Sequence, residues 1–355
     1  MARTRVRLLP LTNIGRRLIG GQRDVRDLAR AVEEIAPAEV EPVPPAIYLP
    51  GAEKHFFGAH PWTTVETELS VLDTTAHHGP VRRYEFHDVL AHPAGFDSPG
   101  GGRHRIRRGQ GVAAGSGRIA RIHTACYCMS RASDTYFGHW LRDACPTALL
   151  ARAGEAQIIH AQPDWTHAPA YLEAFSLNPE SSPVVHVEKL SLFEDHAQGS
   201  SKRQRYASLR KLVRAAFPSR DDGPRAVYFR RGASGARRTI ANEEALIARL
   251  SDVGFTVVDV MGQSLADLAY NLRSARLVVT IEGSHVNHLY FLLPDAARLL
   301  VLIPADKLAM VHLGICRALR FRFGFSVLSP VEDEYGADID GVLETLELLE
   351  QAQTV

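Results

Sequence analysis

Arginines gather around glycines directly after the apolar run 226–230, in a pattern that suits phosphate binding. Arg230 and Arg231 stand at the end of this run, and Arg238 follows shortly. A guanidinium group binds phosphate oxygens through paired N–H groups, and glycine lets the backbone approach a ligand. A solvated basic turn is the alternative, but the position at the end of an apolar run favours an anion site. The same stretch contains Gly232, Gly235 and Arg237.

A second polar segment, 282–288, follows another apolar run, 277–281. A glycine between a strand and a helix leaves the first helical amides free to bind an anion. The full G-x-G-x-x-G pattern is missing from every such turn, which argues against a dinucleotide. No acidic or cysteine partner stands at metal spacing from the two histidines, so we expect no metal. The candidate contacts of this turn are Gly283, Ser284, His285, Asn287 and His288.

A third segment, 136–143, contains an imidazole and a carboxylate at helical spacing. His139 and Asp143 are four residues apart, so on a helix they lie on one face. A carboxylate orients an imidazole and increases its basicity, which is the arrangement of a general base. A structural pair that holds the helix to a neighbour is the alternative, and the spacing does not decide between the two.

The last third of the chain alternates strands and helices, which predicts a parallel, doubly wound α/β sheet. Continuous apolar strands are expected at 226–230, 255–260, 277–281 and 299–303. In such a sheet, ligands bind beyond the carboxyl ends of the strands, where both polar loops lie. The intervening helices are expected at 242–253, capped by Asn242, at 264–275, opened by a Ser264 capping box, and from about residue 284.

The rest of the chain is expected to form a first domain, 1–217, ahead of a second domain, 218–335. A helix, 336–355, is expected to return to the first domain. The Gly/Arg-rich loop 98–118 is interpreted as solvated, with an anion grip as the alternative. Within the first domain we expect helices at 25–35, 136–154 (kinked at Pro146) and 200–217, and strands at 46–49, 67–72, 122–129 and 157–161.

The composition excludes several classes of protein. Apolar residues make up 45% of the 355 residues, and 41 basic residues face 40 acidic ones, so wholesale disorder is excluded and no electrostatic case for nucleic acid exists. No apolar run has the length of a membrane span. Four scattered cysteines predict reduced thiols and a cytoplasmic protein. The N-terminal arginines allow contact with a membrane surface, although Asp24, Asp27, Glu33 and Glu34 dilute that charge.

The three polar segments, taken in order, resemble glycosyltransferase family 61 over residues 124–304. The segment 136–143 is similar to the family's aromatic-aromatic-x-His-Trp-Leu-x-Asp pattern. The segment 282–288 is similar to a glycine-rich turn that precedes an apolar stretch, with Glu282, His285 and His288 in place of a His, a Gly and an Asn of the family. The intervening pattern is matched by Tyr228, Arg230, Arg231, Arg238, Asn242 and Glu243.

The resemblance implies an inverting, metal-independent glycosyltransferase of the GT-B kind, with two Rossmann-like, doubly wound domains facing a cleft. It implies a nucleotide-diphosphate sugar as co-substrate, no cofactor, and a hydroxyl acceptor on a saccharide, glycolipid, peptide or small molecule. Bacterial relatives of the capsular or surface polysaccharide type are the expected branch. His139, oriented by Asp143, is the expected base, with Glu282 as its rival. The expected donor contacts are Arg230, Arg231, Arg238, Asn242, Glu243, Gly283, Ser284, His285, Asn287 and His288.

Two other functions stay open at this point. The altered turn at 282–288 is compatible with a non-catalytic protein that binds or scaffolds a sugar nucleotide. A nucleotide-dependent oxidoreductase with a doubly wound sheet is the second alternative, and the missing glycine fingerprint argues against it.

Overall fold

The computed structural model describes residues 6–20, 24–107, 119–219, 222–232 and 238–352, and these residues form two compact units. The first unit comprises Met1–Ala38 and Gly79–Ala197, and the second comprises Glu39–His78 and Gln198–Val355. This division differs from the expected boundary at residue 218. The long helix α8 (Ser200–Ala216) belongs to the second unit, because its Arg210 and Arg214 bind Asp295 at 2.9 and 2.8 Å.

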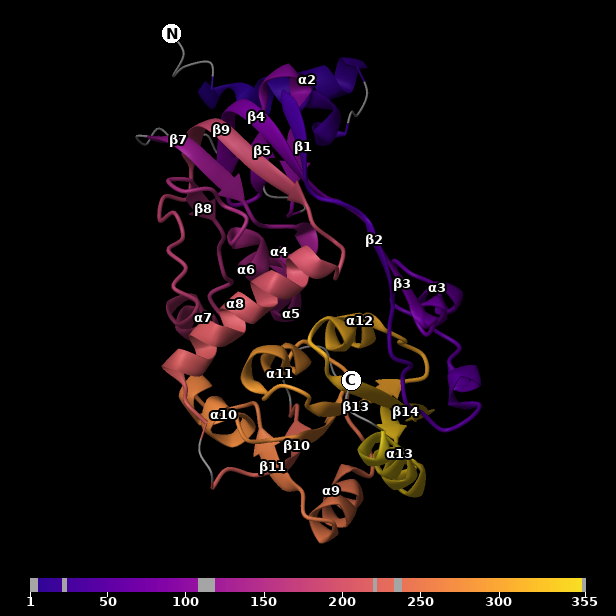
Figure 1. The fold of residues 1–355 in the computed structure, drawn as a ribbon. Helices are drawn as coiled ribbons and strands as arrows, with labels where there is room; N and C mark the ends of the chain where they lie inside the picture. The colour runs from indigo at the N-terminus through magenta and orange to yellow at the C-terminus, as the bar shows by residue number, and fades with distance from the viewer. Residues whose placement is uncertain (1–5, 21–23, 108–118, 220–221, 233–237, 353–355) are drawn as a thin grey trace. The chain divides into compact units, whose positions relative to one another are not determined.

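The second unit is built on a six-stranded sheet with the order β11-β10-β12-β13-β14-β15 (Figure 1). Pairing is parallel from β11 to β14, and β15 runs antiparallel at the edge. The strands expected at 226–230 and 277–281 are confirmed with the same bounds. Both faces of these strands are buried, so their sequences are continuous apolar runs, such as Leu-Val-Val-Thr-Ile at Leu277–Ile281. The bounds are β10 Ala226–Arg230, β11 Thr256–Asp259, β12 Leu277–Ile281, β13 Arg298–Pro304, β14 Arg322–Val331 and β15 Glu334–Gly336.

The strand order creates a switch point between β10 and β12. From β10 the chain crosses to β11 on one side, and it then returns past β10 to β12 on the other side. Figure 1 shows α9 and α13 on one side of this sheet and α10, α11 and α12 on the other. Loops therefore diverge at the carboxyl ends of β10 and β12, where such sheets bind ligands. The helices are α9 Glu243–Asp252, α10 Leu265–Leu272, α11 Val286–Leu292, α12 Val311–Ala318 and α13 Ile339–Gln351.

Two expectations about helix ends meet different outcomes. Ser264 forms the expected capping box, since its side chain accepts from the amide of Asp267 and the Asp267 side chain accepts from Ser264 N. Asn242 does not cap α9; its side chain instead exchanges two hydrogen bonds of 2.9 Å with the backbone of Ala337.

The C-terminal helix α13 packs within the second unit. Its apolar face, including Leu346 and Leu349, joins one core with Leu246 of α9 and with Leu300 and Leu302 of β13. A helix buries an apolar stripe of this kind against another element. The stripe of α13 packs on the face of the six-stranded sheet that also carries α9.

Residues 39–78 extend along the second unit and pair with its strands. Ile47 bridges Gly324 and Ala59 bridges Leu308, so the strand expected at 46–49 is reduced to a single bridge. The strand expected at 67–72 is instead a helix, because Thr64 accepts from Thr67 N and opens a helical turn. The elements are β2 Glu39–Pro42, η2 Ala52–His55, α3 Val65–Ser70 and β3 Thr75–His78.

The first unit contains a mixed sheet with the order β6-β5-β4-β9-β7-β8, and β1 also pairs with β4. Pairing is parallel for β8, β7 and β9 alone, so this unit is not the second doubly wound domain that we expected. Connections of a few residues, such as 93–94, can join only antiparallel strands. The strands are β1 Ala31–Ala36, β4 Val81–His92, β5 Gly95–Asp97, β6 Arg103–Arg105, β7 Ala120–Tyr127, β8 Ala156–Ile158 and β9 Val185–Glu194.

Helices of the first unit are short, and the one expected at 25–35 is replaced by a 3-10 turn and strand β1. The helix expected at 136–154 ends at Ala148 and contains a π-helical turn, Trp140–Ala144. Pro146 has no amide hydrogen to donate, and the amide of Cys145 reaches back to Trp140 O. The helices are α2 Leu9–Gly20, η1 Val25–Leu28, η3 Pro99–Gly101, α4 Arg131–Thr135, α5 Phe137–His139, α6 Cys145–Ala148 and α7 Ala168–Ala174.

The Gly/Arg-rich loop 98–118 is not simply solvated where it is described. Arg103 and Arg105 lie on β6 and bind the buried carboxylate of Asp97 at 3.3 and 2.6 Å. Residues 108–118 lie outside the described part of the chain. No helix within the described residues has the length and apolar character needed to cross a membrane.

Candidate functional site

The loops after β10 and β12 meet at the switch point of the second unit. Arg231 follows β10, and its Nη1 donates to the backbone oxygen of Glu282, which follows β12, at 3.2 Å. Arg238 Nη1 reaches the same oxygen at 3.3 Å and forms an ion pair with the Glu282 carboxylate at 2.5 Å. The two polar segments that the sequence singled out therefore come together. Residues 233–237, including Gly235 and Arg237, lie outside the described residues.

Glu282 is a buried, ionised carboxylate. Burial by itself raises the pKa of this group, but the neighbouring His312 and the charges of Arg238 and Arg231 outweigh burial and hold the pKa below its usual value. His312 Nε2 lies 3.6 Å from Glu282 Oε1, and Tyr290 Oη lies 2.5 Å from His312 Nδ1. A chain of polar groups thus runs from Tyr290 through His312 to Glu282.

Sequence reasoning missed His312 and Tyr290. Both belong to apolar helices, α12 and α11, and both are almost fully buried. A histidine in the first turn of an otherwise apolar helix was the available signal, because a buried imidazole needs a polar partner.

Gly283 allows Arg231 and His285 to approach each other closely. A Cβ at residue 283 would lie 2.9 Å from Arg231 Nη1 and 3.0 Å from His285 Nδ1, closer than real side chains permit. Glycine therefore fits this turn without displacing the Arg231 or His285 side chain, in addition to its expected role in exposing amides. The helix α11 begins at Val286, two residues later than expected.

His285 is neutral and presents a bare ring nitrogen. Thr280 Oγ1 donates to Phe229 O at 2.8 Å, so this oxygen accepts from His285 Nε2–H at 2.8 Å. The proton then resides on Nε2, which leaves a lone pair on Nδ1, and Nδ1 has no hydrogen-bond partner among the described residues. Burial and the Arg231 charge hold the pKa of His285 well below its usual value. Nδ1 is a fixed hydrogen-bond acceptor beside two arginines.

Arg230 has a different environment from Arg231, although the two are neighbours in sequence. Its guanidinium binds Glu243 at 3.2 Å and Glu244 at 2.7 Å, both in the first turn of α9. Tyr228 donates to Glu243 at 2.7 Å. Together with the Asn242–Ala337 contacts, these bonds fasten α9 to β10 and β15. Arg230, Asn242 and Glu243 thus hold the framework and do not face the Glu282–Arg231 cluster.

The other residues expected in the turn occupy three environments. Ser284 is exposed, and its backbone oxygen accepts from Asn287 Nδ2 at 2.9 Å. His288 is buried with its ring edge-on to Phe229, at 6.4 Å between centroids. Ser284 is thus the exposed side chain of this turn, and Asn287 stabilises it.

The expected base, His139, lies in the first unit and is paired as the spacing predicted. Its Nδ1 is 2.7 Å from Asp143 Oδ2, and each side chain is one-third exposed. Arg142 Nη2 lies 2.9 Å from Nε2 and 3.1 Å from Nδ1 of the same ring. An in-plane atom equally close to both nitrogens would overlap the carbon between them, so the guanidinium lies over the ring face. The in-plane lone pair of Nε2 is therefore not taken by Arg142.

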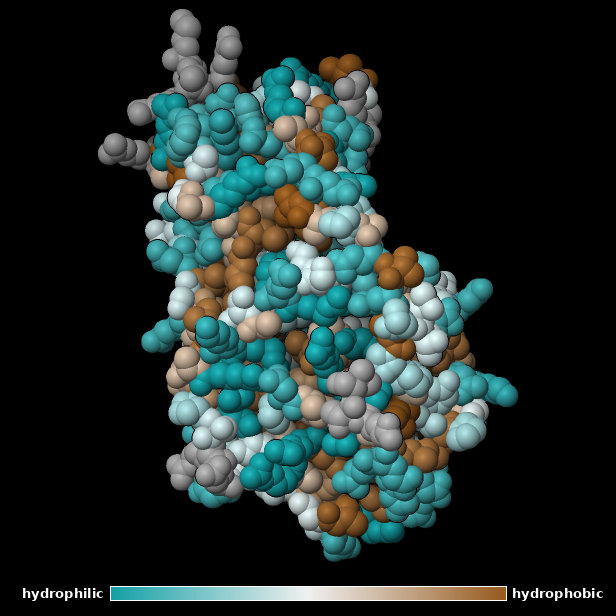
Figure 2. Space-filling view, viewed as in Figure 1, coloured by the Kyte–Doolittle hydropathy of each residue, from teal (hydrophilic) through white to brown (hydrophobic). Residues whose placement is uncertain are grey.

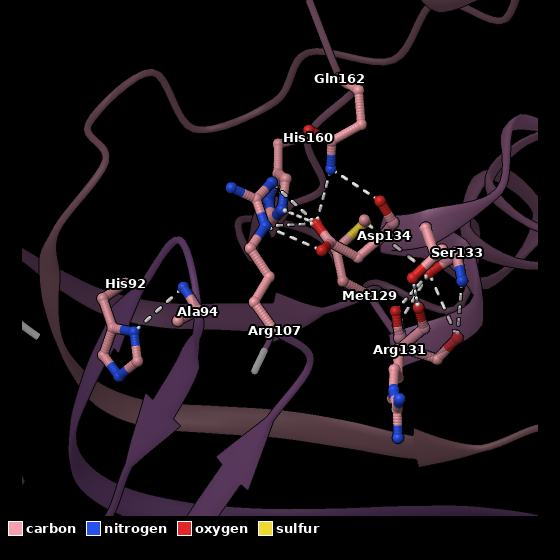
Figure 3. A network of polar contacts seen from close by, with 11 residues as sticks. His92, Ala94, Arg107, Met129, Arg131, Ser133, Asp134, His160 and Gln162 are labelled. Atoms are coloured by element: carbon pink, nitrogen blue, oxygen red, sulfur yellow. Dashed lines mark hydrogen bonds and ion pairs between the residues drawn. The ribbon is translucent and has the colours of Figure 1, made fainter. Parts of the chain in front are cut away.

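A second imidazole–carboxylate pair lies in the first unit, at the carboxyl ends of β7 and β8 (Figure 3). Asp134 of α4 accepts from Arg107 at 2.8 Å, from His160 at 3.1 Å and from Gln162 at 2.9 Å. Burial outweighs the Asp134 hydrogen bond and holds the pKa of His160 below its usual value. The network ties the end of the 98–107 segment to α4 and to the loop after β8, and nothing in the sequence pattern pointed to it.

Among the described residues, no group of three or more histidine, cysteine, aspartate or glutamate side chains is placed to hold a metal ion. All four cysteines are buried and free, and the sulfurs of Cys126 and Cys128 lie 3.5 Å apart.

Comparisons with known proteins point to one family. The family model described as glycosyltransferase 61 matches residues 137–299, which contain His139, Arg231 and the 282–288 turn. The match supports glycosyltransferase family 61 over these residues. No curated protein matches the chain.

Solved structures are similar at a low level. A mutant of the flavo di-iron protein from Thermotoga maritima is 12% identical, with a TM-score of 0.28, covering 52% of this chain and 46% of that chain. A second mutant of that protein is 12% identical, with a TM-score of 0.27, and the match covers 61% and 52%. The chain thus spans about half the length of these proteins.

Proposed function

We propose that this chain, whose residues 137–299 match glycosyltransferase 61, is an inverting transferase that uses a nucleotide-diphosphate sugar without a metal ion. The observation that carries the donor site is the convergence of Arg231 and Arg238 on the backbone oxygen of Glu282, next to Gly283, at the switch point of the sheet. Transfer of a hexosyl or pentosyl group, a role in surface polysaccharide synthesis and a cytoplasmic location belong to the same proposal.

Charge balance in this cluster favours an anionic ligand. Two guanidinium groups, those of Arg231 and Arg238, lie beside the single carboxylate of Glu282. Burial and the neighbouring Arg238 lower the pKa of Arg231 to about 10, so the group is still cationic at neutral pH. A diphosphate placed here would form charge-assisted hydrogen bonds with both guanidinium groups. The same groups would stabilise the charge that grows on the leaving diphosphate.

His285 Nδ1 adds an uncharged acceptor to this site. A neutral lone pair beside two cations can accept a hydrogen bond from a hydroxyl or an N–H of the donor. Ser284, the exposed side chain of the turn, is the second contact that we assign to the donor.

His139 is the base that we assign to the acceptor hydroxyl. Asp143 binds Nδ1–H, so Nε2 carries the lone pair that takes the proton. The acceptor oxygen then forms a bond to the anomeric carbon as the bond from that carbon to the diphosphate oxygen breaks, and its electron pair leaves with the diphosphate. Glu282 is the weaker candidate, because its pKa is held low and its carboxylate is the counter-ion of Arg238.

Calorimetric titration with a panel of free nucleoside diphosphates tests the donor site. We expect one member to bind the wild type, and Arg231→Gln to weaken that binding at least about tenfold, since a charge-assisted hydrogen bond contributes about 1.5–3 kcal/mol. Arg249→Gln is the matched control, because Arg249 is half exposed on α9 and pairs with Asp340. If no diphosphate binds at millimolar concentration, or if both variants bind like the wild type, the donor site is elsewhere.

A non-catalytic sugar-nucleotide-binding protein is the second candidate, favoured by the Glu282–Arg238 ion pair that occupies part of the cationic site. Nucleotide binding without release of diphosphate from any donor sugar would support it over the transferase.

A further inference from the structure

The N-terminal helix α2, Leu9–Gly20, is fastened to the first unit by one of its faces. Val6, Pro10 and Asn13 are buried against that unit. Asn13 Nδ2 donates to Asp97 Oδ1 at 3.1 Å, to Ser98 O at 3.0 Å and to Gly102 O at 3.1 Å. Three bonds from one buried amide fix how the helix is rotated, so its opposite face must point outward.

That outward face is apolar, where a surface helix would normally be polar. Leu11, Leu18 and Ile19 are 62, 83 and 92% exposed. Leu8, Leu11, Ile14 and Leu18 recur at intervals of three and four residues, so they form one stripe along the helix. Figure 2 shows hydrophobic surface at the end of the first unit where Figure 1 places α2. An exposed stripe of this kind marks an interaction surface.

The sequence that contains α2 is basic. Residues 1–23 contain six arginines and no aspartate or glutamate. Arg16 is exposed on α2 beside the apolar stripe. A partner that suits this surface presents apolar groups together with negative charge.

Most of the acidic residues that follow are paired with arginines. Asp24 pairs with Arg26 at 2.7 Å, Glu33 with Arg152 at 2.5 Å, and Glu34 with Arg82 at 3.7 Å. Each of these carboxylates has a cationic partner on the body of the first unit. Three of the four acidic residues expected to dilute the charge are thus neutralised by arginines, and the fourth, Asp27, is exposed on η1.

We propose that α2 docks into the surface of a bilayer that contains anionic phospholipids. A helix with an apolar stripe, arginines beside it and low overall hydrophobicity lies in the plane of the interface, with its apolar side chains below the headgroups. The arginines add attraction to the anionic headgroups. The docking surface is Leu8, Leu11, Ile14, Leu18 and Ile19, with Arg16 at its edge. The proposal does not depend on the transfer reaction.

Vesicle co-sedimentation of the full chain tests this docking. We expect binding to vesicles of phosphatidylcholine mixed with phosphatidylglycerol, and much weaker binding to phosphatidylcholine alone. The variant Leu11→Asp/Leu18→Asp should bind the mixed vesicles at least about tenfold more weakly, because each leucine loses its apolar burial. Arg16→Glu should weaken binding to the mixed vesicles, and added salt should weaken binding of the wild type.

Leu348→Asp is the matched control, since Leu348 is exposed on α13 of the other unit and should leave binding unchanged. Unaltered thermal melting would show that the α2 variants are folded, as expected for exposed positions. The proposal is overturned if the wild type does not sediment with mixed vesicles, or if the Leu11→Asp/Leu18→Asp variant sediments as well as the wild type. Light scattering tests the alternative that a second copy of the chain binds this surface. A dimer that the Leu11→Asp/Leu18→Asp variant dissociates, in a protein that does not bind lipid, would also overturn the proposal.

Discussion

The guanidinium of Arg142 lies over the imidazole face of His139, with Nη2 2.9 Å from Nε2 and 3.1 Å from Nδ1. The two residues are three apart on either side of the start of a π-helical turn, and Asp143 holds the ring from its edge. The ring is thus constrained in two directions, while the in-plane lone pair of Nε2 keeps its direction for an incoming hydroxyl. A structural His–Asp pair would not require that direction.

We expect His139→Ala to lower turnover about 10²–10⁴-fold, the usual contribution of a positioned base. Nucleotide affinity should stay unchanged, because the donor contacts belong to the second unit. The measurement is the initial rate of nucleotide release, with a binding titration on the same sample. His123→Ala is the control, since His123 is three-quarters exposed and pairs with Glu188. Full turnover in His139→Ala would assign the base to another residue.

Gly283→Ala should damage the donor site and destabilise the fold by about 1–3 kcal/mol. The added Cβ would press on Arg231 Nη1 and His285 Nδ1, at 2.9 and 3.0 Å, so both groups must move. Urea unfolding measures the loss of stability, and titration with the nucleoside diphosphate measures the loss of affinity. Gly79→Ala is the matched control, because its Cβ would meet nothing within 4 Å. A Gly283→Ala variant that behaves like Gly79→Ala would contradict the close approach seen in the structure.

Stability should fall as the pH drops below about 6.5. Buried His285 has a pKa well below that of the unfolded chain, so only the unfolded state takes up a proton in this range. His160 has a lowered pKa for the same physical reason and adds to the effect. One such group changes the free energy of unfolding by up to about 1.4 kcal/mol per pH unit.

Urea unfolding in buffers at about pH 7.0, 6.0 and 5.5 measures how the free energy of unfolding changes with pH. The wild type and His285→Gln are compared. The variant should show a smaller loss of stability toward low pH. Glu282 contributes in a different window, because its lowered pKa affects stability only as the pH falls below its usual value of 4.5. Equal slopes in the two proteins would mean that His285 is not held neutral.

Asp134→Ala should destabilise the first unit by about 1–3 kcal/mol, because Arg107, His160 and Gln162 each lose a charge-assisted partner. Asp134→Asn should cost less, since the amide keeps one acceptor for these donors. Chemical unfolding is the measurement, and Asp164→Ala, an exposed position in the loop after β8, is the control. If Asp134→Ala, Asp134→Asn and Asp164→Ala were equally stable, the Asp134 network would not contribute to the stability of the first unit.

The sequence by itself determined four of the six strands in the large sheet of the second unit, and the two loops that form the candidate site. A continuous apolar run such as 277–281 is stable only when it is buried, so its place in the sheet follows from its sequence. The Ser264 capping box defines the start of a helix through local hydrogen bonds. The sequence determined short segments less well. Part of the stretch 25–35 forms strand β1 because it pairs with β4, and most of 67–72 lies in the helix that the Thr64 cap opens. Patterns of a few residues carry too little local energy to decide against such tertiary contacts.

Tertiary structure alone decided which polar residues work together. Side chains of neighbouring residues on an extended chain point in opposite directions. The Arg230 guanidinium therefore binds the Glu243 carboxylate of α9, whereas the Arg231 guanidinium binds the backbone oxygen of Glu282. His312 and Tyr290 joined the site because α12 and α11 bring them to Glu282 from elsewhere in the chain. Side-chain partners distant in sequence are set by how helices pack on a sheet, and no local pattern encodes that packing.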